Sequence, residues 1–408
     1  MELRKDAEKI IRAALEKTKA DSTVYAGLES LPEYKGRLFV IAMGKAAWQM
    51  AQAVKECGLC FEKGLVITKY GHVMGEIEGF EMFEAGHPIP DDGSIAAAER
   101  ALELTEALTE TDMVLTLISG GASALFESPV VSLPELADIT AQLLACGADI
   151  TEINTIRKRL SKVKGGRFAL HCAPAKVYSI ILSDVLGDVP DMIASGPCCA
   201  DPSTCGEALA IAEKYGLRLS DKIRELLKIE TPKALSNATF SMKGSVRVLC
   251  QAAEDCCREL GYETVFLTDR LCCQAREAGA FLASIARTHC TSGKKHAFIA
   301  GGETVVKLTG RGKGGRNQEL ALAAAAGIEG IENALIFSFG SDGTDGPTDA
   351  AGGLVSGCTA GELRRLGYDI EAVLNNNDAY TALKACGGLI ITGPTGTNVN
   401  DLCCVLIG

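Results

Sequence analysis

The stretch Leu38–Met43, followed by Gly44 and Lys45, decides the fold that this sequence predicts. Its six residues, LFVIAM, are all apolar, and the segment 45–57 after the glycine has a helical pattern. A continuous apolar run is typical of a strand buried on both faces, as in a parallel sheet covered by helices. The stretch therefore predicts a strand–turn–helix unit, with a lysine near the N–H groups that begin the helix.

The same alternation of strands and helices continues along the chain. Ser132 and Glu135 form a capping-box pattern that opens one of the helices. The predicted elements of the first half are helix 3–19, strands 38–43 and 64–68, helix 94–108, strand 113–118 and strand 177–182. This order favours a mostly parallel sheet covered on both faces, with its working edge at the carboxyl ends of the strands.

A polar segment, residues 230–245, separates a second α/β block from the first. The predicted elements of that block are strand 246–250, helix 251–260, strand 264–267, helix 273–288, strand 304–308, helix 319–326 and strand 334–339. A chain of 408 residues fits two domains at about 100–200 residues each. We therefore expect an N-terminal domain of residues 1–238 and a C-terminal domain of residues 239–408.

The composition argues against several classes of protein. The formal net charge is -11 and aromatic residues make up 5%, which argues against nucleic-acid binding. The sequence shows no apolar core of a signal peptide and no apolar run long enough to span a bilayer. The 17 cysteines, including the pair Cys57 and Cys60, are then expected to be reduced thiols of a cytoplasmic protein without membrane contact.

Two glycine turns follow predicted strands and could bind an anion. The first contains Gly44 and Lys45, and it is not a Walker A loop, because the residue after the lysine is alanine. The second contains Ser119, Gly120, Gly121 and Ser123, where bare backbone N–H groups can approach a ligand closely. The alternatives are a surface lysine for the first turn and a tight, serine-capped turn for the second.

Basic residues gather between positions 157 and 167 of this acidic protein. Such a run is often a solvated helix face. Lys164 and Arg167 flank a glycine pair that ends the predicted helix, so we predict that these two side chains lie toward the site.

Carboxylates stand after strands in both halves. Asp184 and Asp188 follow strand 177–182, and Asp342 and Asp345 lie with Thr344 in a glycine-rich loop. Such side chains suit Mg²⁺ coordination or a base that accepts a hydroxyl proton. Shaping turns and capping helices is the alternative.

The loop 310–319 is the most specific cluster. It contains Gly314, Gly315, Arg316 and Asn317 before a predicted helix, and arginine in a glycine loop suits phosphate. A dinucleotide fingerprint would need an acidic residue about 20 positions further on, at the end of the next strand; that strand ends in Gly340, Ser341 and Asp342. A mobile surface loop is the alternative.

No histidine forms a persuasive triad with Ser or Cys, so phosphoryl transfer is favoured over hydrolysis.

The ordered set of these motifs resembles the glycerate 2-kinase family with a C-terminal MOFRL domain. The resemblance runs nearly from end to end. It rests on the stretches at 44–46, 86–88, 119–121, 164–167, 183–185, 195–197, 301–303, 315–319, 341–346 and 393–398. Cys198 and Cys199 depart from the smaller residues expected after Pro197, which leaves the sugar acid less defined than the reaction type.

The resemblance implies a Rossmann-like, three-layer α/β/α N-terminal domain, a smaller α/β C-terminal domain with a mixed sheet, and an active site in the cleft between them. It implies transfer of phosphate from ATP, with Mg²⁺, to the 2-hydroxyl of D-glycerate. Lys45 and Arg316 are then the leading catalytic cations, and Asp184 is a catalytic carboxylate. The ligand-binding residues expected are Gly44, Ser119, Gly120, Gly121, Ser123, Lys164, Arg167, Gly196, Glu303, Gly314, Gly315, Asn317 and Thr344. The metal ligands expected are Asp188, Asp342 and Asp345.

Two alternatives remain at this point. Some members of the family carry the label hydroxypyruvate reductase, which would use a nicotinamide. A non-catalytic protein that binds a phosphorylated metabolite would keep the anion loops. The number of chains that assemble is open, with a homodimer as one option.

Overall fold

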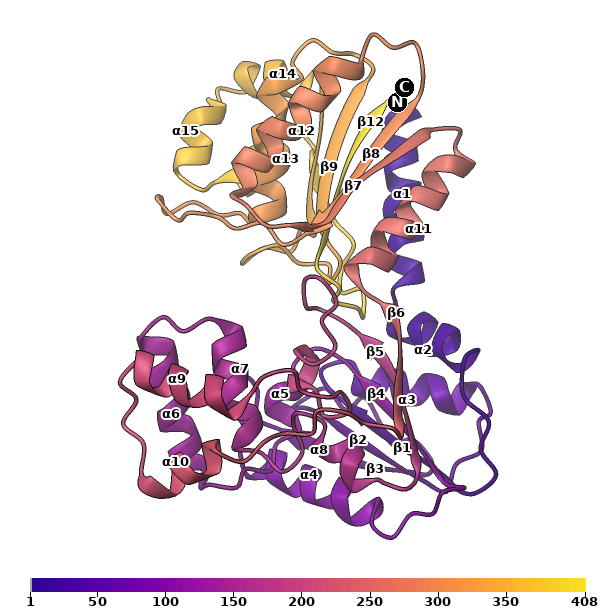
Figure 1. Cartoon of the computed structure of the whole chain (residues 1–408). Coiled ribbons are helices and arrows are strands. Elements are labelled where there is room, and N and C mark those ends of the chain that lie inside the picture. The colour runs from indigo at the N-terminus through magenta and orange to yellow at the C-terminus, as the bar shows by residue number, and fades with distance from the viewer. Residues whose placement is uncertain (1) are drawn as a thin grey trace. The chain divides into compact units, whose positions relative to one another are not determined.

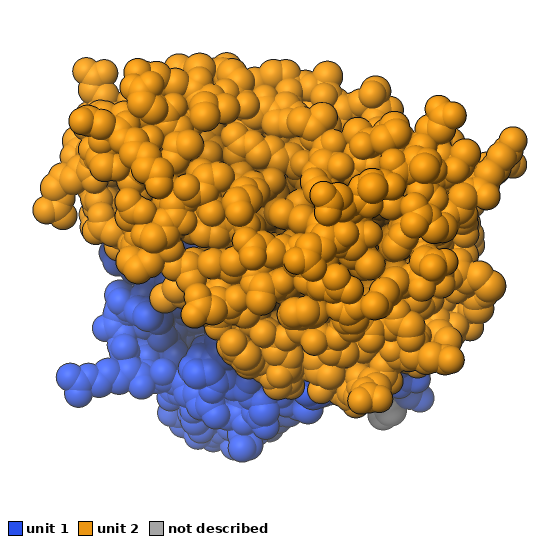
Figure 2. Space-filling view, turned by 90° about the horizontal axis from the view of Figure 1, so that it is seen from below, with its two compact units in different colours: residues 1–22, 244–408 blue, residues 23–243 orange. Residues whose placement is uncertain are grey.

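A computed structural model describes residues 2–408 and divides into two compact units. One unit consists of residues 23–243, and the other joins the residues up to Ser22 to residues 244–408 (Figure 2). The division differs from the predicted boundary at 238 mainly at the start of the chain. The physical reason is α1 (Glu2–Lys17), whose buried apolar face packs against α11 (Val246–Glu259) of the later block.

The unit 23–243 is built on a six-stranded sheet in the order β3-β2-β1-β4-β5-β6. Pairing from β3 to β5 is parallel throughout, as the continuous apolar strands predict. The strands are β1 (Leu38–Met43), β2 (Lys63–Lys69), β3 (Phe80–Ala85), β4 (Met113–Ile118), β5 (Lys176–Leu182) and β6 (Ala238–Gly244).

Helices cover both faces of this sheet. Phe39, Ile41 and Met43 of β1 share a core with α4 (Asp92–Leu104), α5 (Ala122–Leu125) and α8 (Arg167–His171). The alternate residues Val40 and Ala42 are equally buried, and α3 (Ala47–Glu56) packs against β1, β2 and β4. With α2 (Ala20–Leu28), these layers confirm the Rossmann-like α/β/α fold.

A separate helical cluster with its own small core extends from this unit (Figure 1). It consists of α6 (Leu133–Ala145), α7 (Ile150–Arg159), α9 (Cys205–Lys214) and α10 (Asp221–Leu227). Helix α6 begins at the predicted capping box, in which Ser132 and Glu135 exchange hydrogen bonds.

The second unit carries a mixed sheet in the order β11-β10-β9-β12-β8-β7. Only β7 and β8 pair in parallel, and the other pairings are antiparallel. The strands are β7 (Glu263–Leu271), β8 (His296–Gly302), β9 (Ala334–Gly340), β10 (Gly352–Ser356), β11 (Leu389–Ile390) and β12 (Asp401–Ile407). The mixed sheet expected from the resemblance is thus confirmed.

Helices α1 and α11 lie on one side of this sheet, and α12 (Ala275–His289) and α13 (Arg316–Gly327) lie on the other (Figure 1). Three short helices complete the unit: α14 (Thr359–Arg365), α15 (Ile370–Asn375) and α16 (Ala379–Ala385). Within the described chain, no helix is both long enough and apolar enough to cross a membrane.

Two sequence predictions in this unit are wrong. The predicted strand 246–250 is the first turn of α11, in which Val246, Leu249, Cys250 and Ala253 form one buried face at helical spacing. A short apolar run cannot be assigned by periodicity alone, and this one continues as a helix. The segment 304–308 makes only an isolated bridge between Val305 and Gln274, and it is otherwise a loop.

Candidate active site

Three loops meet at the carboxyl edge of the parallel sheet in unit 23–243. Gly44 and Lys45 follow β1, Ser119 and Gly120 follow the adjacent strand β4, and Asp184 follows β5. The N–H of Lys45 donates to the Gly120 carbonyl (2.9 Å), and the N–H of Ala46 donates to Ser119 Oγ (3.1 Å). The structure therefore brings together Ala46 and Ser119, which are 73 positions apart, because β1 and β4 are neighbours in the sheet.

The glycines of these loops are required by close approach. Gly44 has a φ of +118°, and a Cβ there would lie 2.3 Å from Ser119 Oγ and 2.4 Å from its carbonyl oxygen. A Cβ on Gly120 would lie 2.1 Å from Asp184 Oδ2. The carboxylate of Asp184 thus packs directly against bare backbone of the turn. Both glycines are fixed by geometry that a side chain would destroy.

A Gly44→Ala variant is expected to lose about 2–5 kcal/mol of unfolding free energy, from the left-handed backbone and the clash together. Gly58→Ala is the matched control, because Gly58 also has a positive φ (+69°) but has no atom within 4 Å of an added Cβ. Urea unfolding of both variants measures the difference. Equal losses of unfolding free energy in Gly44→Ala and Gly58→Ala would show that the contact between Gly44 and Ser119 is not tight.

His87 is a site residue that the list of predicted ligands did not include. A Cβ built on Gly121 would lie 3.1 Å from the His87 ring and 3.2 Å from Lys45 Cε, so the three residues converge. Burial lowers the pKa of His87, and the positive charges of Lys45 and Lys69 lower it further. The imidazole is therefore neutral at pH 7. The stretch 86–88 was part of the family resemblance, but its sequence gave no sign that His87 lies beside Lys45.

Replacing Lys45 by Met is expected to raise the pKa of His87, since one of the charges that oppose its protonation is removed. The Lys55→Met variant on α3 should leave this pKa unchanged.

In the folded wild-type protein the neutral form of His87 is favoured. The unfolded state therefore binds more protons than the folded state just below pH 6.5, and the stability of the protein falls as the pH falls through this range. Proton NMR titration of the histidine ring measures the pKa of His87 directly. An unchanged pKa in Lys45→Met would contradict the closeness of Lys45 and His87.

The basic segment before position 167 is largely buried, so its interpretation as a solvated face is wrong for Lys158 and Arg159. Lys164, which was predicted to lie toward the site, is buried as well. Lys158 pairs with Asp191 (2.7 Å) and Asp201 (3.1 Å). These partners lie 33 and 43 positions away, which explains why the local pattern was misleading.

Lys164 and Arg167 hold loops in place. The Lys164 ammonium donates to the carbonyls of Ser123 (2.8 Å) and Phe126 (3.0 Å), and burial lowers its pKa to about 8. Arg167 donates to the carbonyls of Lys158 and Ser161. Lys164 also forms an ion pair with the buried carboxylate of Glu127 (3.5 Å). These internal contacts favour a positioning role for both side chains; direct ligand binding by them stays a prediction.

Ser123 and Gly196 lie in one connected group. The hydroxyls of Ser123 and Ser195 are 3.0 Å apart, and Ser195 donates to Asn154 Oδ1 (3.0 Å). Ala194, Ser195 and Gly196 all have positive φ values, and the Gly196 carbonyl accepts the N–H of Gly166 (2.7 Å). Consecutive left-handed residues are costly and are commonly retained near functional sites.

In the other unit, Arg316 is the first residue of α13 and pairs with two carboxylates. Nε and NH2 donate to the two oxygens of Asp401 at 2.5 and 3.0 Å, and NH1 donates to Glu303 at 2.8 Å. Burial raises the pKa of Asp401 to about 6 even though Arg316 favours its ionised form. Sequence reasoning found Arg316 and Glu303 but missed Asp401, which lies at the start of β12, 85 residues from Arg316.

Asp345 acts as the cap of α13. Its two carboxylate oxygens accept the N–H groups of Asn317 (3.2 Å) and Gln318 (2.9 Å), and burial raises its pKa. This geometry favours the helix-capping alternative over the predicted metal-ligand role. Asp342 is half-buried, and one of its oxygens accepts the N–H of Thr344 (2.9 Å).

Across residues 2–408, no group of three or more His, Cys, Asp or Glu side chains is arranged to hold a metal ion. Mg²⁺ bound with a nucleotide needs fewer protein ligands, because it keeps several waters and phosphate oxygens. Asp342 fits such a site as a single carboxylate ligand, and Asp345 does not, because both its oxygens are engaged.

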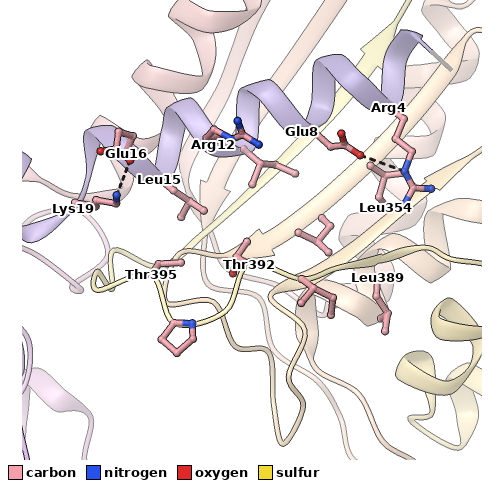
Figure 3. A pocket seen from close by; sticks show the side chains of 14 residues that line it. Arg4, Glu8, Arg12, Leu15, Glu16, Lys19, Leu354, Leu389, Thr392 and Thr395 are labelled. Atoms are coloured by element: carbon pink, nitrogen blue, oxygen red, sulfur yellow. Dashed lines mark ion pairs between the residues drawn. The ribbon is translucent and has the colours of Figure 1, made fainter.

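A cavity of about 610 Å³ opens beside Arg316 within the same unit. Its walls include the predicted residues Glu303, Gly314, Gly315, Arg316 and Asp345. A larger cavity of about 680 Å³ lies between α1 and the loop that contains Thr392 and Thr395 (Figure 3). It is lined by none of the predicted site residues, and its salt-bridged rim, Arg4–Glu8 and Lys19–Glu16, belongs to α1 and the residues just after it.

Two α/β units with cationic side chains at glycine turns are typical of a phosphotransferase that acts on a small molecule. Residues 6–228 match the model of a domain of unknown function, DUF4147, and residues 296–401 match the MOFRL family. The chain belongs to the glycerate 2-kinase family with a C-terminal MOFRL domain.

Relatives of known name support this assignment over nearly the whole chain. A D-glycerate 2-kinase from Thermotoga maritima is 50% identical over 99% of this chain and 98% of its own length. A glycerate 2-kinase from Pyrococcus horikoshii is 42% identical over 97% of this chain and 93% of its own. The crystal structure of the glycerate kinase of Thermotoga maritima superposes with a TM-score of 0.96 and covers both chains completely.

Proposed function

We propose that this kinase transfers the γ-phosphoryl group of ATP to the 2-hydroxyl of D-glycerate, giving 2-phosphoglycerate and ADP. The 50% identity to a D-glycerate 2-kinase over the full chain is the observation that carries the substrate and the position of transfer. In this reaction the 2-hydroxyl oxygen forms the new bond to phosphorus. The bond from phosphorus to the bridging oxygen breaks, and ADP leaves with the electron pair.

Lys45 and the turn of Ser119, Gly120 and Gly121 form the anion site of unit 23–243. The Lys45 side chain passes beside Gly121 of this turn, and the neighbouring His87 is neutral and does not add charge. Such a site binds a carboxylate or a transferring phosphoryl group. Asp184, packed against Gly120, is the base that accepts the proton of the attacking hydroxyl.

Arg316 is the corresponding cation of the other unit. A guanidinium has five N–H donors, and three of them are engaged by Asp401 and Glu303. The remaining two are available to phosphate oxygens. The two carboxylates hold the group at a fixed angle, so little side-chain entropy is lost when a ligand binds.

ATP and Mg²⁺ are the implied second substrate and cofactor. When bound, Mg²⁺ neutralises charge on the β- and γ-phosphates. Asp342 would contribute one ligand from its unit. The metal-ligand role of Asp188, in the other unit, stays a separate prediction. The cytoplasmic location and the homodimer considered from the sequence stay predictions.

Hydride transfer is disfavoured by topology. A dinucleotide fingerprint joins two neighbouring parallel strands through a glycine-rich turn. Here the glycine-rich loop lies between β8 and β9, which are separated in the sheet by the antiparallel strand β12.

A coupled assay tests the proposal. ADP release should require D-glycerate and should be lost when EDTA removes Mg²⁺ and restored when Mg²⁺ is added. Oxidation of NADH in the presence of hydroxypyruvate should stay at the background rate. Nicotinamide turnover without ATP-dependent phosphorylation would overturn the assignment.

A further inference from the structure

The cavity beside Arg316 is lined by two chemically different kinds of residue. The polar and charged residues are Glu303, Thr304, Arg316, Glu319, Asp345 and Asn377. The apolar part is aliphatic, and its residues are Val305, Val306, Leu308, Pro347 and Ala379. Ligand sites commonly have volumes of about 300–1,000 Å³ and combine apolar walls with a few placed polar groups. This cavity, at about 610 Å³, has both properties.

The buried hydroxyl of Thr304 lacks a hydrogen-bond partner among the described residues. Thr304 is only 4% exposed. Native proteins rarely leave a buried hydroxyl without a partner, because its desolvation is not compensated. Thr304 lines the cavity, so a ligand that hydrogen-bonds there would satisfy the group.

The apolar wall is exposed but held in position. Val305 and Leu308 are 53% and 82% exposed, although both are large aliphatic residues. The loop that contains them is fixed by Asn377, whose Oδ1 accepts the N–H groups of Thr309 (2.8 Å) and Gly310 (2.9 Å) and whose Nδ2 donates to the Lys307 carbonyl (3.1 Å). A loop tied by these three bonds presents its apolar side chains as a preformed surface.

The shape and polarity of the cavity select between the two substrates. D-glycerate is small and polar throughout, so it would leave the aliphatic wall uncovered. A nucleotide has a flat base, hydroxyls in the middle and phosphates at the other end. Carboxylates such as Glu303 commonly bind ribose hydroxyls, and arginines bind phosphate.

We propose that this cavity of unit 244–408 holds the nucleoside of ATP, which rests on the proposed kinase reaction. The base packs against Val305, Val306 and Leu308. The ribose hydroxyls reach Glu303 and Thr304, and the phosphates extend toward Arg316. The MOFRL unit is then the part of the chain that selects the nucleotide.

Binding of ADP and of inorganic tripolyphosphate by full-length variants tests this assignment. Leu308→Ser and Val305→Ser remove apolar contact at exposed positions, so the fold should be retained. Both should weaken ADP binding by about tenfold, because a large aliphatic contact is lost, and should leave tripolyphosphate binding unchanged. Leu366→Ser, at a residue that is 50% exposed outside the cavity, is the matched control and should leave both affinities unchanged.

Thr304→Val tests the hydroxyl with almost no change in shape, and Thr304→Ser should restore binding. Unchanged ADP affinity in Thr304→Val, Leu308→Ser and Val305→Ser, measured by calorimetry, would overturn the assignment. The KM for ATP should rise in these variants while the KM for D-glycerate stays the same. If the wild type bound ADP through these residues but did not phosphorylate D-glycerate, the reaction proposed above would fail and the nucleoside site would stand.

Discussion

The Lys45→Met variant is expected to lose about a thousandfold in kcat without unfolding. The Lys45 side chain reaches Gly121, in the turn that follows β4: its Cε lies 3.2 Å from a Cβ built on that glycine. A preorganised donor aimed at developing charge contributes about 10²–10³-fold to a rate, and phosphoryl transfer depends almost entirely on such groups. Methionine keeps the length and apolar stem of the side chain, so packing is retained and only the charge is lost.

Lys55→Met is the matched control for this experiment. Lys55 lies on α3, the helix that follows Lys45, and forms an exposed ion pair with Glu78. Exposed pairs contribute about 0–1 kcal/mol, so kcat and stability should stay near the wild-type values. Steady-state kinetics together with thermal unfolding separate the two effects. A folded Lys45→Met enzyme with a rate near that of the wild type would remove Lys45 from the mechanism.

The Arg316→Met variant should also lose about a thousandfold or more in kcat, since arginines that stabilise a transferring phosphoryl group contribute about 10³–10⁵-fold. Arg316→Lys should recover little, because an ammonium cannot reproduce the paired bonds to Asp401 and the third bond to Glu303. Arg364→Met is the control, since Arg364 is 70% exposed and pairs with Glu329 on the surface. Equal activity in Arg316→Met and Arg364→Met would contradict the assigned role.

Arg316→Met has a second expected consequence, for stability. The carboxylate of Asp401 would be buried without its partner, so its pKa would rise further above 6. The folded state then binds a proton that the unfolded state releases near pH 4. Stability should therefore fall as pH rises from about 4 through the folded-state pKa, more steeply than in the wild type. Urea unfolding between pH 4 and pH 8 measures this slope.

The sequence predicted the parts of the fold whose signal is local. The apolar runs Leu38–Met43 and Met113–Ile118 are strands with those bounds, because each is buried on both faces. The Ser132 box begins α6 as expected, because capping is a contact between residues three apart. The first turn of α11 was missed because a short apolar run does not distinguish a strand from a helix. The place of α1 was missed because it packs against α11, more than 200 residues away in the sequence.

The same distinction applies to the site. Gly44, Lys45, Ser119 and Gly120 could be predicted because each follows a strand, and neighbouring parallel strands bring their ends together. Asp401 and His87 carried no local signal, because their roles come from partners far along the chain. The buried ammonium of Lys158 looked like a solvated charge, since its carboxylate partners Asp191 and Asp201 lie 33 and 43 positions away in the sequence. The sequence allowed two interpretations of Asp345, as a metal ligand or as a helix cap, and only its hydrogen bonds to α13 distinguish them.

Phosphorus NMR of the product tests the central claim most directly. The enzyme is incubated with ATP, Mg²⁺ and D-glycerate, and the new phosphomonoester signal is recorded with proton coupling. Transfer to the 2-hydroxyl places phosphorus beside a single methine proton, so the account predicts a doublet that grows as the signals of ATP give way to those of ADP. A triplet from coupling to a methylene group would show transfer to the 3-hydroxyl, and the absence of any new phosphomonoester would contradict the kinase itself.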